Sequence, residues 1–496
     1  MCRRYNIATI IKKLKEYPFI EKMAFCQKYS TYIMSSSKLD FINKPNAIYP
    51  WELEVFAEFS LFADAPRAKK SLQMDGEGEF IKIINIIRNY QHPFLRQQKN
   101  LNFANSFVMI TGLQQFKSQE NILDRLYRYN YFWSFSNEKI DMPNIFANHF
   151  NGITYSRFRE LGALIFFYAS LNQPTGDIIR YLVLKYKDVV DFLKINRTDY
   201  KSQQSIKIDD NYENTIYGFN YLHPYPFIEF GGYYFLPLPY LIVDAVTESL
   251  LTRVTYDNNS LREKIGKEVA QSYMETIFKE CCTYEEVLPE VEYYQGKRKL
   301  DAPDVLIKQG SCFCFIDTKL STPKLELRKF NQKAIENTIA QYAKYIIQVY
   351  NRVKDFCEGL FYPFTNETDI DKNNVFGIVA VLEDSYISRR QIYDKVLNDL
   401  NIKPESNEAT FIKTHIKFTN FRDLELFAFR SYDIFIALKE KANNPKDWND
   451  LGLYNEYFFK NRKPKRMAAI KNFTSLNQET ITSSIEELVA HGIISK

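Results

Sequence analysis

Apolar side chains in the first 200 residues recur at intervals of three and four positions. This spacing predicts helices, most clearly over residues 51–62 and 80–90. The acidic DGEGE stretch at residues 75–79 interrupts the pattern and is predicted to form a turn between helices. Residues 1–220 are therefore expected to form a mainly helical domain.

A cluster of aromatic side chains follows within this helical region. Residues 127–133 include three tyrosines, a phenylalanine and a tryptophan, and Arg125 and Arg128 stand among them. Aromatic side chains with interleaved arginines can stack nucleic-acid bases. At helical spacing, however, the same residues more often form the buried face of a core. The sequence favours the core interpretation.

The pattern changes at residues 221–241, where prolines, aromatic runs and the pair Gly231 and Gly232 replace the helical periodicity. Such a segment predicts a hairpin with a glycine turn. A helical pattern at residues 244–254 follows and connects this junction to the rest of the chain. Beyond it, short apolar runs alternate with helical patterns, which is typical of α/β structure.

Residues 305–316 form two short apolar runs around a glycine-containing turn, which predicts a β-hairpin. Asp304 stands at the beginning of the first strand, and Asp317 and Lys319 stand at the end of the second. Alternate residues of a strand share a face, and the two ends meet in an antiparallel hairpin. The three ionisable side chains are therefore expected to converge.

Convergence of these side chains favours a cation-dependent chemistry. Two buried carboxylates carry a desolvation cost that a hard divalent cation can offset. Mg²⁺ accepts a few carboxylate oxygens, keeps several waters and bridges to phosphate, and Mn²⁺ can substitute for it. Such a site can activate water and stabilise charge that develops on a phosphodiester, with Lys319 as the group that orients the water.

At these residues the sequence resembles the PD-(D/E)xK nuclease superfamily, which includes restriction endonucleases and RecB-like nucleases. The matching residues are Pro303 and Asp304 and, thirteen positions later, Asp317, Thr318 and Lys319. An aspartate stands where the family more often has glutamate. The resemblance implies that Asp304 and Asp317 bind Mg²⁺ and that Lys319 is the catalytic lysine.

The family's fold begins with a helix that carries a further acidic residue, and residues 261–280 supply a helical pattern at that place. Glu268 follows Gly266 and borders the apolar side of this helix, so the resemblance makes it the main candidate for a third metal ligand. The family's acidic residue often falls four positions after such a glycine, where this chain has Ala270, and Glu263 and Glu275 are therefore alternatives.

Downstream, residues 332–353 predict a helix with Gln341 and Tyr345 on one face. This pair resembles the QxxxY motif of RecB-like nucleases, which implies that Gln341 helps to hold the active site and that Tyr345 contacts nucleic acid. A buried strand at residues 375–382 and a helix at 388–400 complete an αβββαβα order that resembles the family core.

The expected fold is therefore an α+β protein of several domains. The helical domain at residues 1–220 precedes the hairpin and connecting helix at 221–255. A restriction-endonuclease-like α/β nuclease domain spans residues 256–440, of which about 255–400 carry the resemblance. Residues 441–496 are expected to form a small helical segment.

That last segment has an apolar side formed by Ile481, Ile485, Leu488 and Ile493, and Gly492 after the helical pattern acts as its C-terminal stop. The pattern fits a plain packing helix, and it also fits the second half of a winged helix-turn-helix. Four basic residues stand upstream of it: Arg462, Lys463, Lys465 and Arg466.

Basic residues flank the predicted hairpin. Lys297, Arg298 and Lys299 precede its first strand and are expected to grip the phosphates of a nucleic acid. A second group follows the hairpin: Lys324, Arg328, Lys329 and Lys333. The whole chain carries 65 basic and 60 acidic residues, a net charge of +5 that does not by itself identify a polyanion binder.

The seven cysteines form no CxxC pair, which favours reduced thiols and a cytoplasmic location. Cys312 and Cys314 alternate with phenylalanines, as expected of a strand rather than a zinc site. No apolar run approaches the ~20 residues of a membrane-spanning helix, so no membrane association is expected.

These patterns predict a Mg²⁺-dependent deoxyribonuclease, an endonuclease in preference to an exonuclease, of the kind found in bacterial antiviral defence. Its partners would be DNA and a second protein or second copy bound through the N-terminal region. The alternative is a non-catalytic nucleic-acid-binding or assembly factor on the same fold. The sequence leaves the choice of DNA or RNA and the sequence specificity open.

Overall fold

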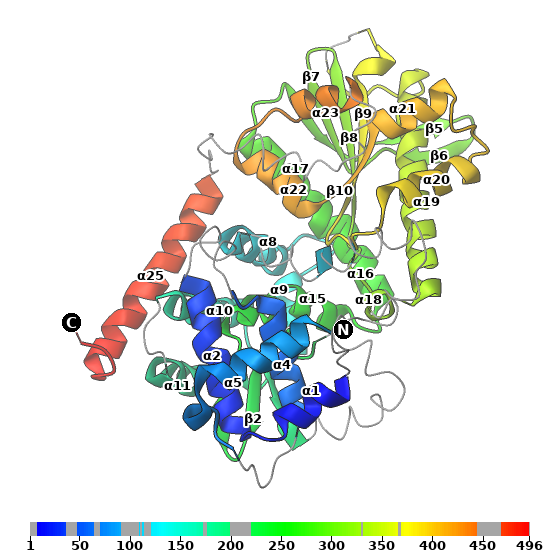
Figure 1. The fold of residues 1–496 in the computed structure, drawn as a ribbon. Coiled ribbons are helices and arrows are strands. Elements are labelled where there is room, and N and C mark those ends of the chain that lie inside the picture. Colours follow the sequence, from blue (N-terminus) through cyan, green and yellow to red (C-terminus); the bar gives the residue numbers. More distant parts are fainter. Residues whose placement is uncertain are drawn as a thin grey trace.

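The computed structural model describes residues 7–35, 47–63, 70–90, 109, 112–113, 121–171, 176–198, 220–328, 331–365, 369–443 and 468–495. Figure 1 shows a mainly helical half that contains both ends of the described chain and a second half built on a β-sheet. The two halves meet around α8, α9, α15 and α16.

The first helices pack as a group. They are α1 (Ile7–Leu14), α2 (Phe19–Ser35), α4 (Pro50–Phe62) and α5 (Leu72–Arg88). Together with residues 222–241 they enclose their own apolar core. The predicted turn at residues 75–79 is wrong, because α5 runs through it. Burial of Phe80, Ile83 and Ile84 in this core outweighs the cost of two helical glycines, about 1 kcal/mol each.

A small sheet joins these helices to the rest of the helical half. Its strands are β1 (Lys194–Asn196), β2 (Phe227–Phe230) and β3 (Tyr233–Phe235). β2 and β3 are antiparallel and are connected by Gly231 and Gly232. Both glycines have positive φ angles, +61° and +78°, which the tight two-residue turn requires. The predicted hairpin is confirmed.

The helical half contains further helices beyond this first group. They are α8 (Ile122–Ser134), α9 (Met142–His149), α10 (Tyr155–Ser170), α11 (Gly176–Lys185), α12 (Lys187–Val190), the short helix η4 (Pro239–Leu241), α14 (Ile242–Ala245) and α15 (Glu248–Thr255). In α8, Tyr127, Phe132 and Trp133 are buried, and Arg125 and Arg128 are buried in ion pairs. The core interpretation of this cluster is confirmed.

The second half is built on a five-stranded sheet. In spatial order its strands are β10 (Ile416–Asn420), β9 (Val375–Val381), β8 (Cys312–Lys319), β7 (Val305–Gln309) and β4 (Glu286–Pro289). β4, β7 and β8 pair antiparallel, whereas β8, β9 and β10 pair parallel. The predicted hairpin of β7 and β8 is therefore confirmed, and β8 is the central strand of the five-stranded sheet.

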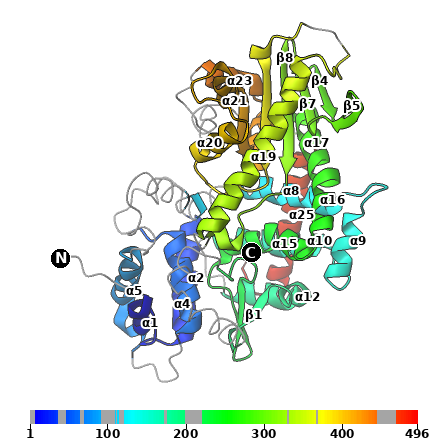
Figure 2. The same ribbon diagram turned by 90° about the vertical axis from the view of Figure 1, so that its right-hand side faces the viewer.

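Helices cover both faces of this sheet (Figure 2). One face packs against α17 (Gln271–Cys281), α22 (Phe421–Phe429) and α23 (Ile434–Asn443). The other packs against α19 (Gln332–Cys357), α20 (Arg389–Asp399) and α21 (Asn407–His415). Shorter elements are α16 (Asn259–Ile265), the π-helix η5 (Gly266–Ala270), α18 (Leu325–Arg328), η6 (Lys372–Asn374) and the hairpin of β5 (Glu292–Gln295) and β6 (Arg298–Asp301). The protein is thus a mixed α/β protein.

One apolar core extends across both halves. It contains α8, α10 and α15, one face of the central sheet, and α25 (Ala468–Ala490). The core therefore includes residues on both sides of the boundary expected at residue 220. In α25, Ile470, Phe473 and Leu488 are buried in it, so this helix packs along the helical half (Figure 1).

The four basic residues that precede α25 lie outside the described residues. Within the described part of the chain, each helix is too short or too polar to span a bilayer.

Candidate active site

Asp304, Asp317 and Lys319 meet at one end of the central sheet. Val305 pairs with Ile316 in the antiparallel register of β7 and β8. Asp304 and Asp317 are the next residues toward that end of the two strands and therefore stand opposite each other. Because side chains alternate along a strand, all three residues share the face of Phe313 and Phe315, which packs against α19. The structure therefore brings the three predicted catalytic residues together.

The two carboxylates are held differently. The backbone N–H and the hydroxyl of Thr318 both donate to Asp304 Oδ2, each at 2.6 Å. Lys319 Nζ lies 2.7 Å from Asp317 Oδ2. That contact is an ion pair without hydrogen-bond alignment, and Asp317 Oδ2 is a buried oxygen with no hydrogen-bond donor among the described residues. Lys319 is thus the charged partner of Asp317.

Burial dominates the electrostatics of this group. Burial and the nearby charge of Asp317 raise the pKa of Asp304 to about 7. Burial also raises the pKa of Asp317, although Lys319 opposes the shift. Burial by itself would lower the pKa of Lys319, but the two carboxylates outweigh it and the lysine pKa is raised. One lysine therefore offsets two carboxylates only in part.

This donor set fits a hard divalent cation. A cation near Asp304 and Asp317 would relieve the repulsion between their carboxylates. Within the described ranges, no three His, Cys, Asp or Glu side chains are grouped closely enough to hold a metal by themselves. Mg²⁺ suits a site with two carboxylates because it keeps several of its waters.

Helix α19 places Gln341 and Tyr345 beside these residues, as the sequence predicts. Gln341 Nε2 donates to the hydroxyl of Tyr345, and the Tyr345 ring centroid lies 5.3 Å from Lys319 Nζ. The tyrosine ring thus packs over the lysine ammonium. Gln341 contacts Tyr345 rather than a carboxylate in this arrangement.

Glu268 does not lie with the aspartates. Lys139 Nζ and Asn137 Nδ2 contact its carboxylate at 3.0 and 3.2 Å. The physical reason is local: the π-helix η5 adds a residue to the turn and changes the direction of the side chains that follow. Of the two alternatives, Glu263 lines the same cleft as Asp304, and Glu275 pairs with Lys279.

Glu290 is an acidic residue that the sequence analysis missed. Pro289 of β4 pairs with Val305, so Glu290 stands one register position from it, opposite Asp304. Burial raises the pKa of Glu290, and Asp301 and Asp317 add to the shift while Lys267 opposes it. The antiparallel register of β4 was the signal that could have identified it, but that pairing is not visible in a local pattern.

The predicted phosphate-binding residues Lys297, Arg298 and Lys299 lie on and before β6 and are exposed. Lys299 forms an ion pair with Glu292 across the hairpin at 2.6 Å. None of the three lines the cleft, although Asp301 at the end of the same strand does. In the second basic group, Lys324 lines the cleft.

The candidate site opens into a cleft of about 1280 Å³. Its walls come from the sheet half and from the helical half. The sheet half contributes Asp304, Asp317, Lys319, Gln341 and Tyr345, and the helical half contributes His149, Tyr225, Arg253 and residues of α16.

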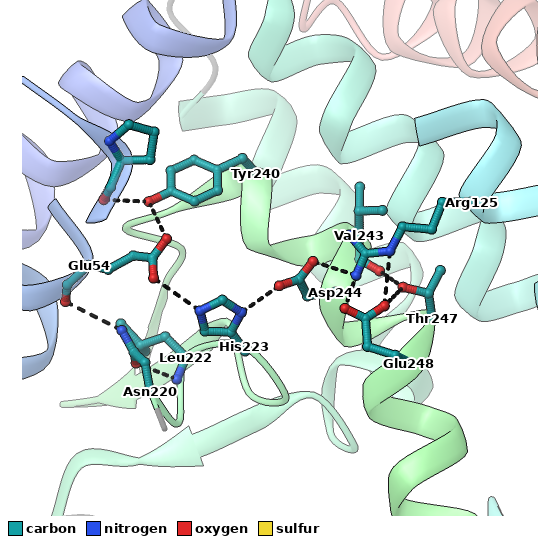
Figure 3. Close-up of polar contacts among 11 residues, drawn as sticks. Glu54, Arg125, Asn220, Leu222, His223, Tyr240, Val243, Asp244, Thr247 and Glu248 are labelled. Carbon is teal, nitrogen blue, oxygen red and sulfur yellow. Dashed lines mark hydrogen bonds and ion pairs between the residues drawn. The ribbon is translucent and has the colours of Figure 1, made fainter. Parts of the chain in front are cut away.

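A second charged cluster reaches this cleft through His223 and Glu248 (Figure 3). His223 bridges Glu54 of α4, at 3.0 Å from Nε2, and Asp244 of α14. Arg125 of α8 contacts Asp244 at 2.5 Å and binds both oxygens of Glu248. This cluster ties α4 to α8, α14 and α15.

Comparison with known proteins adds no relative. No family model, no curated protein and no solved structure matches this chain. The residues of the cleft therefore carry the functional argument.

Proposed function

We propose that this protein is a metal-dependent nuclease that hydrolyses phosphodiester bonds in DNA, with Asp304, Asp317 and Lys319 as its catalytic centre. The observation that carries the proposal is the convergence of these side chains at the end of one sheet, with Asp317 buried, Asp304 and Lys319 half-buried, the carboxylates only partly neutralised and the group open to a large cleft. The order of helices and strands from α17 to α20 also fits the restriction-endonuclease-like core.

The residues of the chain divide the work. Asp304 and Asp317 would hold Mg²⁺, which would supply charge stabilisation at the scissile phosphate and lower the pKa of a water. Lys319 would orient the attacking water and donate toward a phosphate oxygen as negative charge develops there. Water would then add to phosphorus and lose a proton to solvent, the bond to the leaving oxygen would break, and that oxygen would take up a proton from solvent. Tyr345 keeps the Lys319 ammonium in place.

Cleavage of supercoiled plasmid, linear duplex and single-stranded DNA tests the proposal. We expect cutting of plasmid with Mg²⁺ or Mn²⁺ and none with EDTA. Asp317→Asn and Lys319→Ala should each lower the rate by about 10³-fold or more, as loss of a central electrostatic group does. Glu268→Gln is the matched control, because its carboxylate lies outside the cleft, and its rate should stay within about twofold.

The pattern across the variants decides between the functions. Equal rates in wild type, Asp317→Asn and Lys319→Ala would remove these residues from the catalytic centre. If no substrate is cut, Mn²⁺ binding becomes the decisive measurement. Binding lost in Asp317→Asn would leave a nuclease that requires a partner, and no binding would favour the non-catalytic DNA-binding factor. Loss of cutting in Glu290→Gln would add Glu290 to the site.

A further inference from the structure

The helical wall of the cleft contains an arginine whose charge has no acidic partner. Arg253 of α15 lines the cleft, and its Nη1 donates to the backbone oxygen of Phe192 at 2.8 Å. Among the described residues, no carboxylate forms an ion pair with it. Burial lowers its pKa, because a guanidinium is costly to remove from water without a counter-ion.

Aromatic rings hold this guanidinium in place. Its central carbon lies 5.3 Å from the ring centroid of Phe150 and 5.3 Å from that of Tyr225. Arginine stacked in this way keeps the planar fork of N–H donors that matches phosphate oxygens. The side chain is therefore fixed before any ligand binds, which lowers the entropic cost of binding.

Two neighbouring groups favour an anion at the same wall. His149 also lines the cleft, and burial and the charge of Arg253 lower its pKa, so a negative ligand would relieve both groups. Arg262 of α16 lines the cleft between this wall and the candidate catalytic centre. It donates to the backbone oxygen of Leu320 and to the hydroxyls of Thr255 and Thr322, all of them neutral acceptors.

Acidic side chains are present in the same part of the cleft but are engaged elsewhere or exposed. Glu248 is bound by Arg125, and Asp257 and Glu263 are exposed to solvent. The wall thus presents Arg253 without an acidic partner in the cleft that also contains two incompletely neutralised carboxylates, whereas the charge of Glu383 acts on Arg262.

We infer that Arg253, supported by His149, forms a binding subsite for a phosphate group of the nucleic-acid strand whose other phosphate lies at Asp304 and Asp317. The inference rests on the proposed function and extends it, because it assigns the helical half a direct part in substrate binding. The phosphate is either a backbone phosphodiester or the terminal phosphate of a strand end, since both present the same oxygens.

Binding measured without cleavage tests the inference. Fluorescence anisotropy in EDTA would follow a labelled single-stranded 12-mer on the full chain. Arg253→Met keeps the apolar stem between the two rings and removes the charge, and we expect the Kd to rise about tenfold. Arg180→Met removes the same charge from an exposed position of α11 and should change the Kd by less than about twofold.

The salt dependence gives a second measurement. One lost phosphate contact should lower the slope of log Kd against log salt concentration by about 0.7 for a single strand. Arg253→Lys keeps the charge and loses the fork, so an intermediate Kd is expected. If the thermal midpoint of Arg253→Met shows that this variant is unfolded, the Kd of Arg253→Lys tests the subsite in its place.

A neutral methylphosphonate placed at each position in turn locates the phosphate. Wild type should lose affinity at one position most strongly, and Arg253→Lys should lose less there. Oligonucleotides with a 5′-phosphate, a 3′-phosphate or neither distinguish a terminal from an internal phosphate. Equal affinities of the Arg253 and Arg180 variants, or no binding by wild type, would overturn the subsite.

These outcomes are separable from the test of catalysis. Weaker binding by Arg253→Met, together with neither cleavage nor Mn²⁺ binding by wild type, would keep the subsite and reject the nuclease. Cleavage that depends on Asp317, with unchanged binding by Arg253→Met, would keep the nuclease and reject the subsite.

Discussion

Two buried clusters of charged residues reach the same cleft and differ in how their charges are satisfied. The cluster around His223 and Arg125 contains three carboxylates, and each of them is contacted by at least two donors (Figure 3). The cluster around Lys319 contains two carboxylates, and one oxygen of Asp317 has no aligned donor. Satisfied charges hold elements together, whereas unsatisfied charges are available to a ligand.

Arg125→Met should produce the largest effect on stability. Removing this guanidinium breaks two buried ion pairs, with Glu248 and with Asp244, and leaves His223 as the cation beside Asp244; we expect a cost of about 3–5 kcal/mol of unfolding free energy. The urea midpoint of the full chain measures the loss. Arg157→Met is the matched control, because its pair with Asp188 is largely exposed and worth about 1 kcal/mol or less. Equal losses would abolish the distinction between buried and exposed pairs here.

The second-largest effect is a loss of folding stability at alkaline pH, when His223 loses its proton. Burial alone would lower the pKa of His223, but Glu54 and Asp244 raise it to about 9. Because the folded pKa exceeds the ordinary value of 6.5, the stabilisation is complete below pH ~6.5 and is lost as pH rises through about 9. Wild type should lose on the order of 2 kcal/mol across this range relative to His223→Gln.

Thermal unfolding of wild type and His223→Gln from pH 6 to 10 measures that difference. Tyrosines and lysines that titrate at high pH affect both proteins, so the difference between the two curves isolates His223. Parallel curves would show that His223 does not depend on the two carboxylates for its charge.

Asp317→Asn should have the smallest effect on stability and the opposite sign. The raised pKa of Asp317 means that its ionised form destabilises the folded protein above the ordinary aspartate range. Without divalent cations at pH 8, the variant should be as stable as wild type or more stable by about 1 kcal/mol. Added Mg²⁺ should raise the thermal midpoint of wild type and leave the variant unchanged.

Asp188→Asn serves as the control, since Asp188 pairs with Arg157 on the surface. A clear loss of stability in Asp317→Asn without metal would mean that the carboxylate is a structural partner of Lys319. The two clusters would then differ less than their hydrogen bonds indicate.

Local patterns predicted the parts of the site that lie close together in sequence. The hairpin of β7 and β8 places Asp304, Asp317 and Lys319, and helical spacing places Gln341 next to Tyr345. Alternation in a strand and the period of a helix are properties of a few adjacent residues, so the sequence alone could predict these parts of the site.

The rest depends on contacts between distant segments. Glu290 stands opposite Asp304 because β4 pairs with β7, and Glu268 of the π-helix η5 forms an ion pair with Lys139, a residue of a distant segment. Arg253 enters the cleft through the packing of α15 beside Phe150 and Tyr225. Helix propensity failed in α5 for the same reason, since its glycines are compensated by a core built from other helices.

The apolar core that joins α8, α10, α15 and α25 to the central sheet has a practical consequence for truncation. A fragment that starts at residue 256 would carry α17 with Tyr273 stripped of its ring contacts with Tyr131 and Phe132 of α8. Such an exposed apolar surface promotes aggregation. Expression of the sheet half alone should therefore yield insoluble material, and a soluble minimal unit should retain residues 121–198 and α25.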